Sequence, residues 1–292
     1  MSHVNTKKCL ICKRKNDTLH WHIDSETGAI WVWCNGKCQR GYSLYDYCRH
    51  AGVSLKDLLK GEFDFKESTP NEVRKMEWPA WFVPLSDSRA KQGVEYIKSR
   101  GLTLEGEMYF DIDAKSIVFP YHFQTVFVGA QMRLLNPKMD EDGEIQKMDT
   151  LPGTRLGYLF YGWNQEPLPP HVKGVVVTEG AFNALAIQQA LNKLYGGLYK
   201  NPYKVIAASG SGASEHQLEV VKELKDKGYA TIVAPDSDEA GMKMLKKFSH
   251  TDSITHYVLT GHDNIDWNDA LKSMGHEEFA KWFIGRVQRV KS

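Results

Sequence analysis

Cysteines near the start of the sequence have the spacing of metal ligands. Cys9 and Cys12 form a CxxC pair, and Cys34 and Cys38 form a CxxxC pair. Two such pairs supply the four thiolates of a structural Zn²⁺ site, and an all-thiolate site leaves no position for a substrate. The alternatives are a redox-active pair, for which the thioredoxin context is absent, and cysteines that simply pack. We therefore predict a structural zinc site, and we expect Cys48 to be a small buried side chain.

Acidic residues follow two of the short apolar runs in the second half of the chain. Glu179 follows VVVT, and Asp236 and Asp238 follow TIVAP. The carboxyl ends of parallel strands meet at one edge of a sheet, so these carboxylates are expected to lie close together. Carboxylate oxygens are ligands of Mg²⁺ and Mn²⁺, and Mg²⁺ keeps water positions for substrate phosphates. The pattern predicts a catalytic Mg²⁺ or Mn²⁺ site.

A second acidic group, Asp263, Asp266 and Asp269, occurs in HDNIDWNDAL after the last apolar run. These side chains are candidates for a second metal or its water shell, as in two-metal phosphoryl transfer. A helix N-cap is the alternative for Asp238 and Asp269, since both precede helical segments. An N-cap does not account for Glu179, because a glycine follows it directly and the helix begins only later.

A parallel sheet is needed to bring these acids together. After residue 173, the apolar runs GVVVTEG, KVIAASG, ATIVAPD and SITHYVL alternate with helical segments. This alternation predicts an α/β fold in which helices cover a parallel sheet on both faces. Upstream, residues 86–101 predict a helix that stops at a glycine, and residues 116–123 and 125–135 predict strands.

The 292 residues are enough for two domains at roughly 150 residues each. We predict a zinc ribbon at residues 1–60, in which HWHID and AIWVW pair as a hairpin. Residues 61–80 mix charges with proline and lack an apolar period, which is typical of a linker or an extended strap. A mixed α+β subdomain at 81–170 and a catalytic subdomain with C-terminal helices at 171–292 complete the predicted organisation.

The charge balance limits how this chain binds nucleic acid. With 37 Lys and Arg against 36 Asp and Glu, the net charge is +1, so any nucleic-acid surface is local. Basic residues around the first cysteine pair and three tryptophans on the predicted hairpin suit a single-stranded ligand, whereas a solvated turn over a small tryptophan core is the alternative. No apolar run reaches the ~18 residues of a membrane span, and the start lacks a signal-peptide core. We expect a soluble protein in the cytoplasm.

Two segments of the chain resemble the TOPRIM signature. GVVVTEGAFNAL carries a strand-end Glu-Gly, and VAPDSDEAGMKML carries a DxDxxG. DnaG-type primases, topoisomerases and some nucleases share this signature. The cysteine ribbon, YIKSRGLTLEG, IVFPYHFQTVFVGAQMRLL and QKMDTLPGTRLGYLFYG follow one another in an order similar to that of DnaG-type primases, especially small bacteriophage ones. The resemblance covers nearly the whole chain.

The resemblance implies a role for each acidic residue at a matching position. Glu179, Asp236 and Asp238 match the metal-binding acids of the family. Asp266 and Asp269 match an auxiliary acidic motif.

The resemblance also implies roles for three basic residues. Arg133 and Lys147 match residues that face nucleotide or template, and Lys147 is expected to take part in catalysis. Arg155 is a weaker candidate of the same kind.

The implied activity is that of a DNA primase, which joins ribonucleoside triphosphates into short RNA primers on single-stranded DNA. The sequence contains no GxxxxGK[ST] motif, so a separate replicative helicase would be recruited. A metal-dependent nuclease that uses the same acids is one alternative, and a non-catalytic zinc-ribbon adaptor for DNA or a helicase is another. A topoisomerase is less favoured, because it needs a tyrosine nucleophile on a large gate domain.

Overall fold

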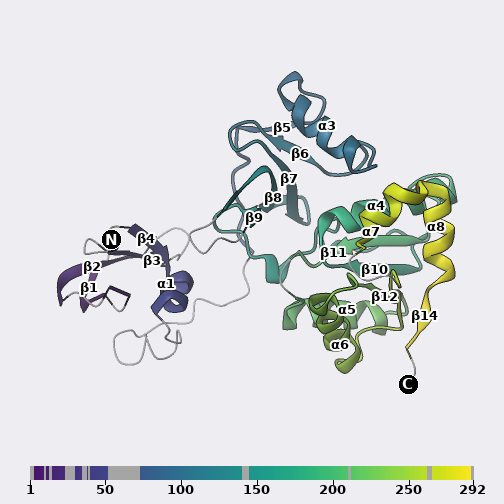
Figure 1. The fold of residues 1–292 in the computed structure, drawn as a ribbon. Helices are drawn as coiled ribbons and strands as arrows, with labels where there is room; N and C mark the ends of the chain where they lie inside the picture. The colour runs from purple at the N-terminus through teal and green to yellow at the C-terminus, as the bar shows by residue number, and fades with distance from the viewer. Residues whose placement is uncertain are drawn as a thin grey trace. The chain divides into compact units, whose positions relative to one another are not determined.

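The computed structural model of the protein describes residues 3–9, 11–12, 15–23, 30–34, 38, 40–51, 73–139, 145–209, 212–261 and 265–290. It divides into two compact units, Met1–Glu72 and Val73–Ser292 (Figure 1). Across the described ranges, no helix is both long enough and apolar enough to cross a membrane.

The first unit is built on an antiparallel sheet. In its described part, four strands lie in the order β1-β2-β3-β4 and helix α1 follows them. Their bounds are β1 His3–Lys8, β2 Lys15–Ile23, β3 Ile30–Cys34, β4 Arg40–Ser43 and α1 Leu44–Ala51. β2 and β3 pair with Leu19 opposite Cys34, so the predicted hairpin is confirmed. Helix α1 starts after Ser43, whose hydroxyl accepts a hydrogen bond from the Asp46 N–H at 3.1 Å, as an N-cap does.

The second unit begins with an antiparallel sheet. Within the described residues, five strands lie in the order β5-β6-β7-β8-β9. The predicted helix at 86–101 forms as a short 3₁₀ turn, η1, followed by α3, which ends before Gly101 at a φ of +74°. The bounds are β5 Phe82–Pro84, η1 Ser88–Ala90, α3 Lys91–Ser99, β6 Tyr109–Asp111, β7 Ser116–Phe123, β8 Val126–Met139, β9 Ile145–Thr150 and η2 Leu156–Tyr158.

The segment before β5 lies against this sheet. The Met76 N–H donates to the Phe127 carbonyl at 2.9 Å, and the Trp78 ring packs edge-on against Tyr109 and Phe127 at 4.6 and 4.9 Å. Residues 73–80, which belong to the predicted linker, are therefore packed on the second unit. Residues 61–72 lie outside the described residues.

A parallel sheet forms the rest of the second unit. In the part that the structure describes, the strand order is β11-β10-β12-β13-β14, with β10 to β13 parallel and β14 antiparallel at the edge. This confirms the predicted α/β fold. The elements are β10 Gly174–Thr178, α4 Ala181–Tyr195, β11 Tyr203–Ala207, α5 Glu215–Asp226, β12 Ala230–Ala234, α6 Glu239–His250, β13 His256–Tyr257, α7 Trp267–Met274, α8 His276–Gly285 and β14 Gln288–Arg289.

Alternation along β10 explains why helices cover both faces of this sheet. Val176 belongs to a core shared with α4, α7 and α8, whereas Val175 and Val177 belong to a core shared with α5 and α6. Successive side chains of a strand point to opposite faces, so an apolar run must be covered on both sides. Figure 1 shows these two helix layers on either side of the sheet.

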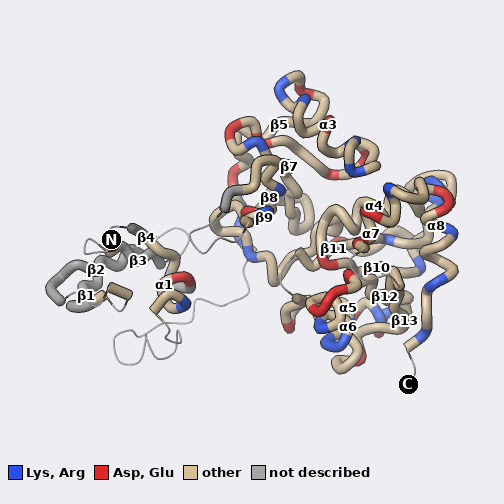
Figure 2. Tube along the Cα trace, in the orientation of Figure 1, with Lys and Arg blue, Asp and Glu red and all other residues tan. Residues whose placement is uncertain are grey.

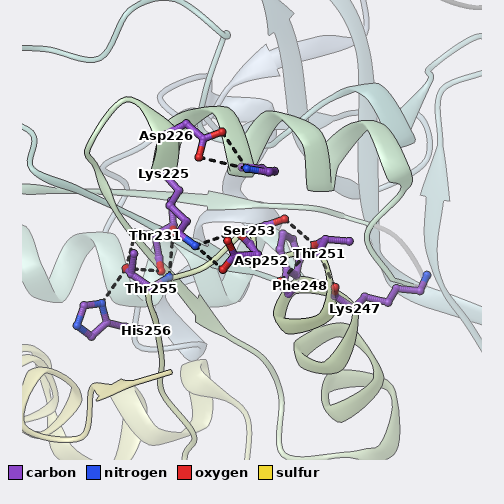
Figure 3. A network of polar contacts seen from close by, with 11 residues as sticks. Lys225, Asp226, Thr231, Lys247, Phe248, Thr251, Asp252, Ser253, Thr255 and His256 are labelled. Atoms are coloured by element: carbon purple, nitrogen blue, oxygen red, sulfur yellow. Dashed lines mark hydrogen bonds and ion pairs between the residues drawn. The ribbon is translucent and has the colours of Figure 1, made fainter. Parts of the chain in front are cut away.

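A polar network closes the end of this sheet where β12 begins (Figure 3). Thr231 and Thr255 exchange hydrogen bonds between backbone N–H groups and hydroxyls, at 3.0 and 3.1 Å. The Lys225 ammonium contacts the Asp252 carboxylate at 2.5 Å, and His256 Nδ1 lies 2.8 Å from the Thr255 hydroxyl. These contacts hold the link from α6 to β13 beside β12, and they leave the opposite, carboxyl end of the strands for other groups.

The two sheets of the second unit share one core and are fastened together by two amide side chains. The Phe119 ring on β7 packs edge-on against Phe182 on α4 at 5.0 Å. Buried Gln189 on α4 accepts from the Thr103 N–H at 2.9 Å and donates to the Glu105 carbonyl at 2.6 Å. Asn268 on α7 donates to the Arg100 carbonyl at 2.9 Å. The loop after α3 is thereby tied to α4 and α7.

Candidate active site and metal centres

The four cysteines of the first unit are arranged to hold a metal ion. Their sulfur atoms all lie within 4.8 Å of one another, and the Cys9–Cys38 and Cys12–Cys34 separations are 3.9 and 3.8 Å. Zn–S bonds of about 2.3 Å in a tetrahedron place the sulfurs about 3.8 Å apart. The geometry therefore fits a structural Zn²⁺ site. Cys48 is buried on α1 and does not belong to this group.

The electrostatics of the cluster favour a bound cation. Burial raises the pKa of Cys38 to about 12, and the neighbouring thiols of Cys12 and Cys34 raise it too. The Tyr47 hydroxyl lies 3.8 Å from Cys9 Sγ as a hydrogen-bond donor, the kind of outer contact that orients a metal ligand. Thiols that resist ionisation on their own become thiolates when a divalent ion supplies the compensating charge.

Glu179 and Asp236 come together because their strands are neighbours. β10 pairs with β12, and their last residues, Thr178 and Ala234, are register partners. Glu179 follows Thr178 directly, and its Oε1 accepts a hydrogen bond from the Asp236 backbone N–H at 3.1 Å. Two carboxylates distant in the chain are therefore placed at one rim of the sheet.

Gly241 allows helix α6 to approach these two residues closely. A Cβ at this position would lie 2.1 Å from the Asp236 carbonyl oxygen and 2.6 Å from Glu179 Oε1, so only glycine fits. Asp238 is the N-cap of the same helix, because its Oδ1 accepts from the Gly241 N–H at 2.8 Å. The N-cap interpretation of Asp238 is thus correct. Gly241 is the glycine of the DxDxxG motif, and its lack of a side chain permits the close approach.

The surroundings of these carboxylates disfavour their charged forms. Burial raises the pKa of Asp236 to about 7, and the nearby carboxylates of Glu179, Asp266 and Asp238 raise it as well. Asn183 opposes this effect by donating from Nδ2 to Asp236 Oδ1 at 2.6 Å. Burial also raises the pKa of Glu179. A divalent cation would reverse these shifts, and oxygen ligands beside a glycine cradle suit Mg²⁺ or Mn²⁺.

The three carboxylates do not form a closed ligand set. Among the described residues, the cysteine cluster alone has three or more ligand atoms within 4.8 Å of one another. Asp238 is exposed, and its Oδ1 accepts the hydrogen bond of the helix cap.

A cleft of about 410 Å³ joins the acids to the antiparallel sheet. Arg133, on β8, is half-buried and sits opposite Ile117 on β7 and Met148 on β9. It lines the same cleft as the Glu179 and Asp236 carboxylates. The lining residues come from both sheets and the loops between them, and they include Arg100, Phe119, Gln131, Arg133, Met148, Glu179, Phe182, Asn183, Ser209, Asp236 and Asp266.

Two other predicted basic residues do not line this cleft. Lys147 is exposed on β9, directly before Met148, which does line it. Because side chains alternate along a strand, Lys147 belongs to the opposite face of the sheet. Arg155 is half-buried just before η2 and is not a lining residue.

The auxiliary acids occupy distinct positions. Asp266 lines the cleft, its Oδ2 lies 3.7 Å from Arg100 Nη2, and its Oδ1 accepts from the Asp269 N–H at 2.7 Å. Asp266 is therefore the N-cap of α7, and the N-cap interpretation of Asp269 is wrong. Asp269 is exposed in the first helical turn, because α7 begins three residues earlier than an N-cap at Asp269 would require. Asp263 lies outside the described residues.

Arg100 and Asn183 are polar residues of the cleft that sequence reasoning missed. The Arg100 guanidinium lies 5.0 Å from the centre of the Phe182 ring and beside Asp266, so it stands at the acidic rim. A cation near the end of a helix interacts favourably with the helix dipole whatever else it does, so the sequence carries no signal for a role of Arg100 in the cleft. Asn183 is a buried polar residue within the apolar run AFNALAI, and that exception was the available signal.

The comparisons with known proteins agree with this architecture. A family model described as Toprim-like matches residues 176–271. These residues form a Toprim-like domain. It contains Glu179, Asp236 and Asp266, which line the cleft, and Asp238, which caps α6. No curated protein sequence matches the chain.

Solved primase structures share the fold. The catalytic core of the Escherichia coli primase has a TM-score of 0.50 at 16% identity, over 70% of this chain and 76% of that one. The Aquifex aeolicus primase, with zinc-binding and RNA polymerase domains, has a TM-score of 0.51 at 17% identity, over 99% and 80%. The RNA polymerase domain of Mycobacterium tuberculosis DnaG, in complex with a double-stranded DNA oligomer with a 6-nucleotide overhang, has a TM-score of 0.52 at 17% identity, over 70% and 76%. The resemblance to DnaG-type primases is thus confirmed for the fold around the Toprim-like domain.

Zinc content tests the cysteine cluster. We expect one zinc ion per chain in the purified protein and none after Cys9 and Cys12 are both replaced by Ser, because two ligands cannot hold the ion tightly. Cys48→Ser is the matched control and should keep its zinc. Elemental analysis measures each variant, and one zinc per chain in the double variant would refute this ligand set.

Gly241→Ala tests the close approach of α6. The added methyl group should destabilise the protein by about 1–3 kcal/mol, since backbone and a carboxylate occupy its place. Gly285→Ala is the control, because a Cβ there meets nothing within 4 Å. Urea denaturation compares the two variants, and equal midpoints would contradict the packing described.

Asp236→Asn tests the charge at the rim without metal. The folded state raises the Asp236 pKa from 3.8 to about 7, so the folded state binds the proton more tightly and wild-type stability falls as pH rises between these values. Asn carries no charge to desolvate. With EDTA present, we expect the variant to melt at a higher temperature than wild type at pH 8 and nearly with it at pH 4. A gap that shrinks towards pH 8 would contradict the sign of this shift.

Proposed function

We propose that this chain is a DNA primase, a nucleotidyltransferase that makes short RNA primers on single-stranded DNA from ribonucleoside triphosphates. The observation that carries the proposal is the cleft in which Glu179 and Asp236 share one cavity with Arg133. Carboxylates that hold a divalent ion and a guanidinium that binds phosphate are the two requirements for handling a triphosphate.

The fold supports this proposal over other Toprim-like activities. The solved structures that share it are named a primase catalytic core and the zinc-binding and RNA polymerase domains of a primase. A third is named as a complex with a double-stranded DNA oligomer with an overhang, so a nucleic-acid ligand of that kind suits the same architecture.

The acidic residues, Asn183 and Arg133 have distinct roles in the proposed reaction. Glu179, Asp236 and Asp238 would hold Mg²⁺ or Mn²⁺, which neutralises the triphosphate and favours ionisation of the primer 3′ hydroxyl. Asn183 orients the Asp236 carboxylate through its 2.6 Å hydrogen bond. Arg133 binds the triphosphate from the opposite wall, where its planar guanidinium matches phosphate oxygens.

The remaining predicted residues act around this centre. Asp266 and Asp269 form the auxiliary acidic group, with Asp266 at the rim and Asp269 further out. Lys147 and Arg155 do not line the cleft, so we assign both to phosphates of the template or of an entering nucleotide. For Lys147 this assignment replaces the catalytic role that the resemblance implied.

The zinc ribbon and the partners complete the proposal. Bound Zn²⁺ would stabilise the first unit, which engages the single-stranded template. A separate replicative helicase would supply that template, and the proposed place of action is the cytoplasm of a bacterial host, as for a primase encoded by a bacteriophage.

Asp236→Ala tests the proposed reaction. We expect primer synthesis to fall by at least about 10²-fold, because phosphoryl transfer depends on a correctly held metal. Glu239→Gln is the matched control, since this neighbouring acid is exposed and pairs only with Lys243 at 2.8 Å among the described residues. The assay contains single-stranded DNA, labelled ribonucleotides and Mg²⁺ or Mn²⁺, and circular dichroism and template binding verify the fold.

The same assay distinguishes the other functions. New short RNA supports a primase, shortened DNA indicates a metal-dependent nuclease, and binding without either product indicates an adaptor. Undiminished RNA synthesis by Asp236→Ala would reject the proposed site.

A further inference from the structure

A second polar pocket lies at the start of β11, away from the acidic rim. Its volume is about 450 Å³, within the range of small-molecule sites. It shares no lining residue with the cleft of Glu179 and Asp236. The β7–β8 turn, the segment after η2 and the first residues of β11 form its wall, with Glu107, His122, Gln124, Trp163, Asn164 and Lys204 among the lining residues.

Lys204 is the unusual residue of this pocket. Its side chain is half-buried, yet its ammonium forms no hydrogen bond or ion pair with any residue that the structure describes. Burial lowers the pKa of Lys204, and the more distant charge of Glu107 raises it. Partly buried ammonium groups normally have an anionic partner, because desolvation without one is costly.

The neighbouring carboxylate is already engaged. Glu107 Oε1 lies 3.2 Å from His122 Nδ1, and the Glu107 carbonyl accepts from the Tyr161 hydroxyl at 2.9 Å. The Glu107 carboxylate is thus in contact with His122, and Lys204 has no direct anionic partner among the described residues.

The rest of the wall is held in place by its own hydrogen bonds. The Gln124 N–H donates to the Asn164 carbonyl at 2.7 Å, with Gln124 at a φ of +54°. The Trp163 Nε1–H donates to the Glu166 carbonyl at 2.9 Å, and its ring lies 6.1 Å from the Phe160 ring. The backbone of the lining residues Gln124 and Asn164 and the Trp163 indole are therefore held in place.

We propose that this pocket binds a nucleoside phosphate, with the phosphate on Lys204. A phosphate dianion satisfies the uncompensated ammonium, and lysine binds phosphate as a point charge. The Gln124 and Asn164 amides offer hydrogen bonds to a base or ribose, and the Trp163 ring offers apolar contact. The site goes beyond the proposed primer synthesis, since it uses none of the metal-binding acids.

Calorimetric titration of the full zinc-loaded chain with AMP and with orthophosphate tests this site. The buffer is passed over a chelating resin before the protein is added, so free divalent ions are absent while the zinc stays bound, and the acidic rim repels phosphate and does not compete. We expect saturable AMP binding that weakens about 10- to 100-fold in Lys204→Met, as loss of a hydrogen bond to a charged group implies. Lys200→Met is the matched control, because this exposed lysine lines none of the described cavities, and it should bind as wild type does.

Three further measurements keep the proposal open to refutation. Arg133→Ala should bind AMP normally, and loss of binding in that variant would move the ligand to the acidic cleft. Asn164→Asp adds a negative charge at the pocket with almost no change of shape, so it should weaken binding even if Lys204→Met folds poorly. If a 5′-phosphorylated oligonucleotide binds and AMP does not, the phosphate that Lys204 holds is that of a strand end and the mononucleotide proposal is wrong. Absence of binding by all three ligands would overturn the site.

Discussion

Glu179 and Asp236 are forced into proximity at the ends of adjacent strands, in surroundings that disfavour negative charge. The sheet register fixes the backbone, the Glu179 to Asp236 N–H hydrogen bond fixes one side chain, and Asn183 fixes the other. A divalent cation bound here would relieve the repulsion between the two carboxylates. Gly241 and the Asp238 cap serve the same arrangement, because both bring the start of α6 to the edge of the sheet where Glu179 and Asp236 lie.

The two walls of the cleft carry side chains of different chemistry. The parallel sheet contributes carboxylates, and the antiparallel sheet contributes Arg133, Gln131 and the Phe119 ring. Acidic and basic residues are otherwise scattered over the second unit in the view of Figure 2, in keeping with a net charge of +1. With this net charge, any recognition of a polyanion by the chain would depend on local groups of charges.

Much of the fold could be predicted because it is encoded in local patterns. The strands β10, β11 and β12 are buried on both faces, so their apolar residues are continuous in the sequence. The metal-binding cysteines are recognisable because the members of each pair are only three or four positions apart. The strand-end position of Glu179 and Asp236 follows from that topology. The two-residue strand β14 has no such pattern, since its place depends on pairing with β13 alone.

The rest of the site depends on contacts that no local pattern contains. The face on which Lys147 lies is set by strand register, and a shift of one residue would reverse it. Arg100 reaches the rim because Asn268 binds its carbonyl, a contact between segments 168 positions apart. Asp266 replaces Asp269 as the cap of α7 because the helix starts one residue after Asp266, and boundaries are what sequence patterns fix least well.

The fastening of the loop after α3 has a mechanical consequence. Gln189 alone provides three hydrogen bonds to Thr103 and Glu105, and it does so from the helix that also carries Asn183. Moving the two sheets apart would break these hydrogen bonds and leave a buried amide unsatisfied, which is costly. The width of the cleft therefore depends on a side chain that does not line it.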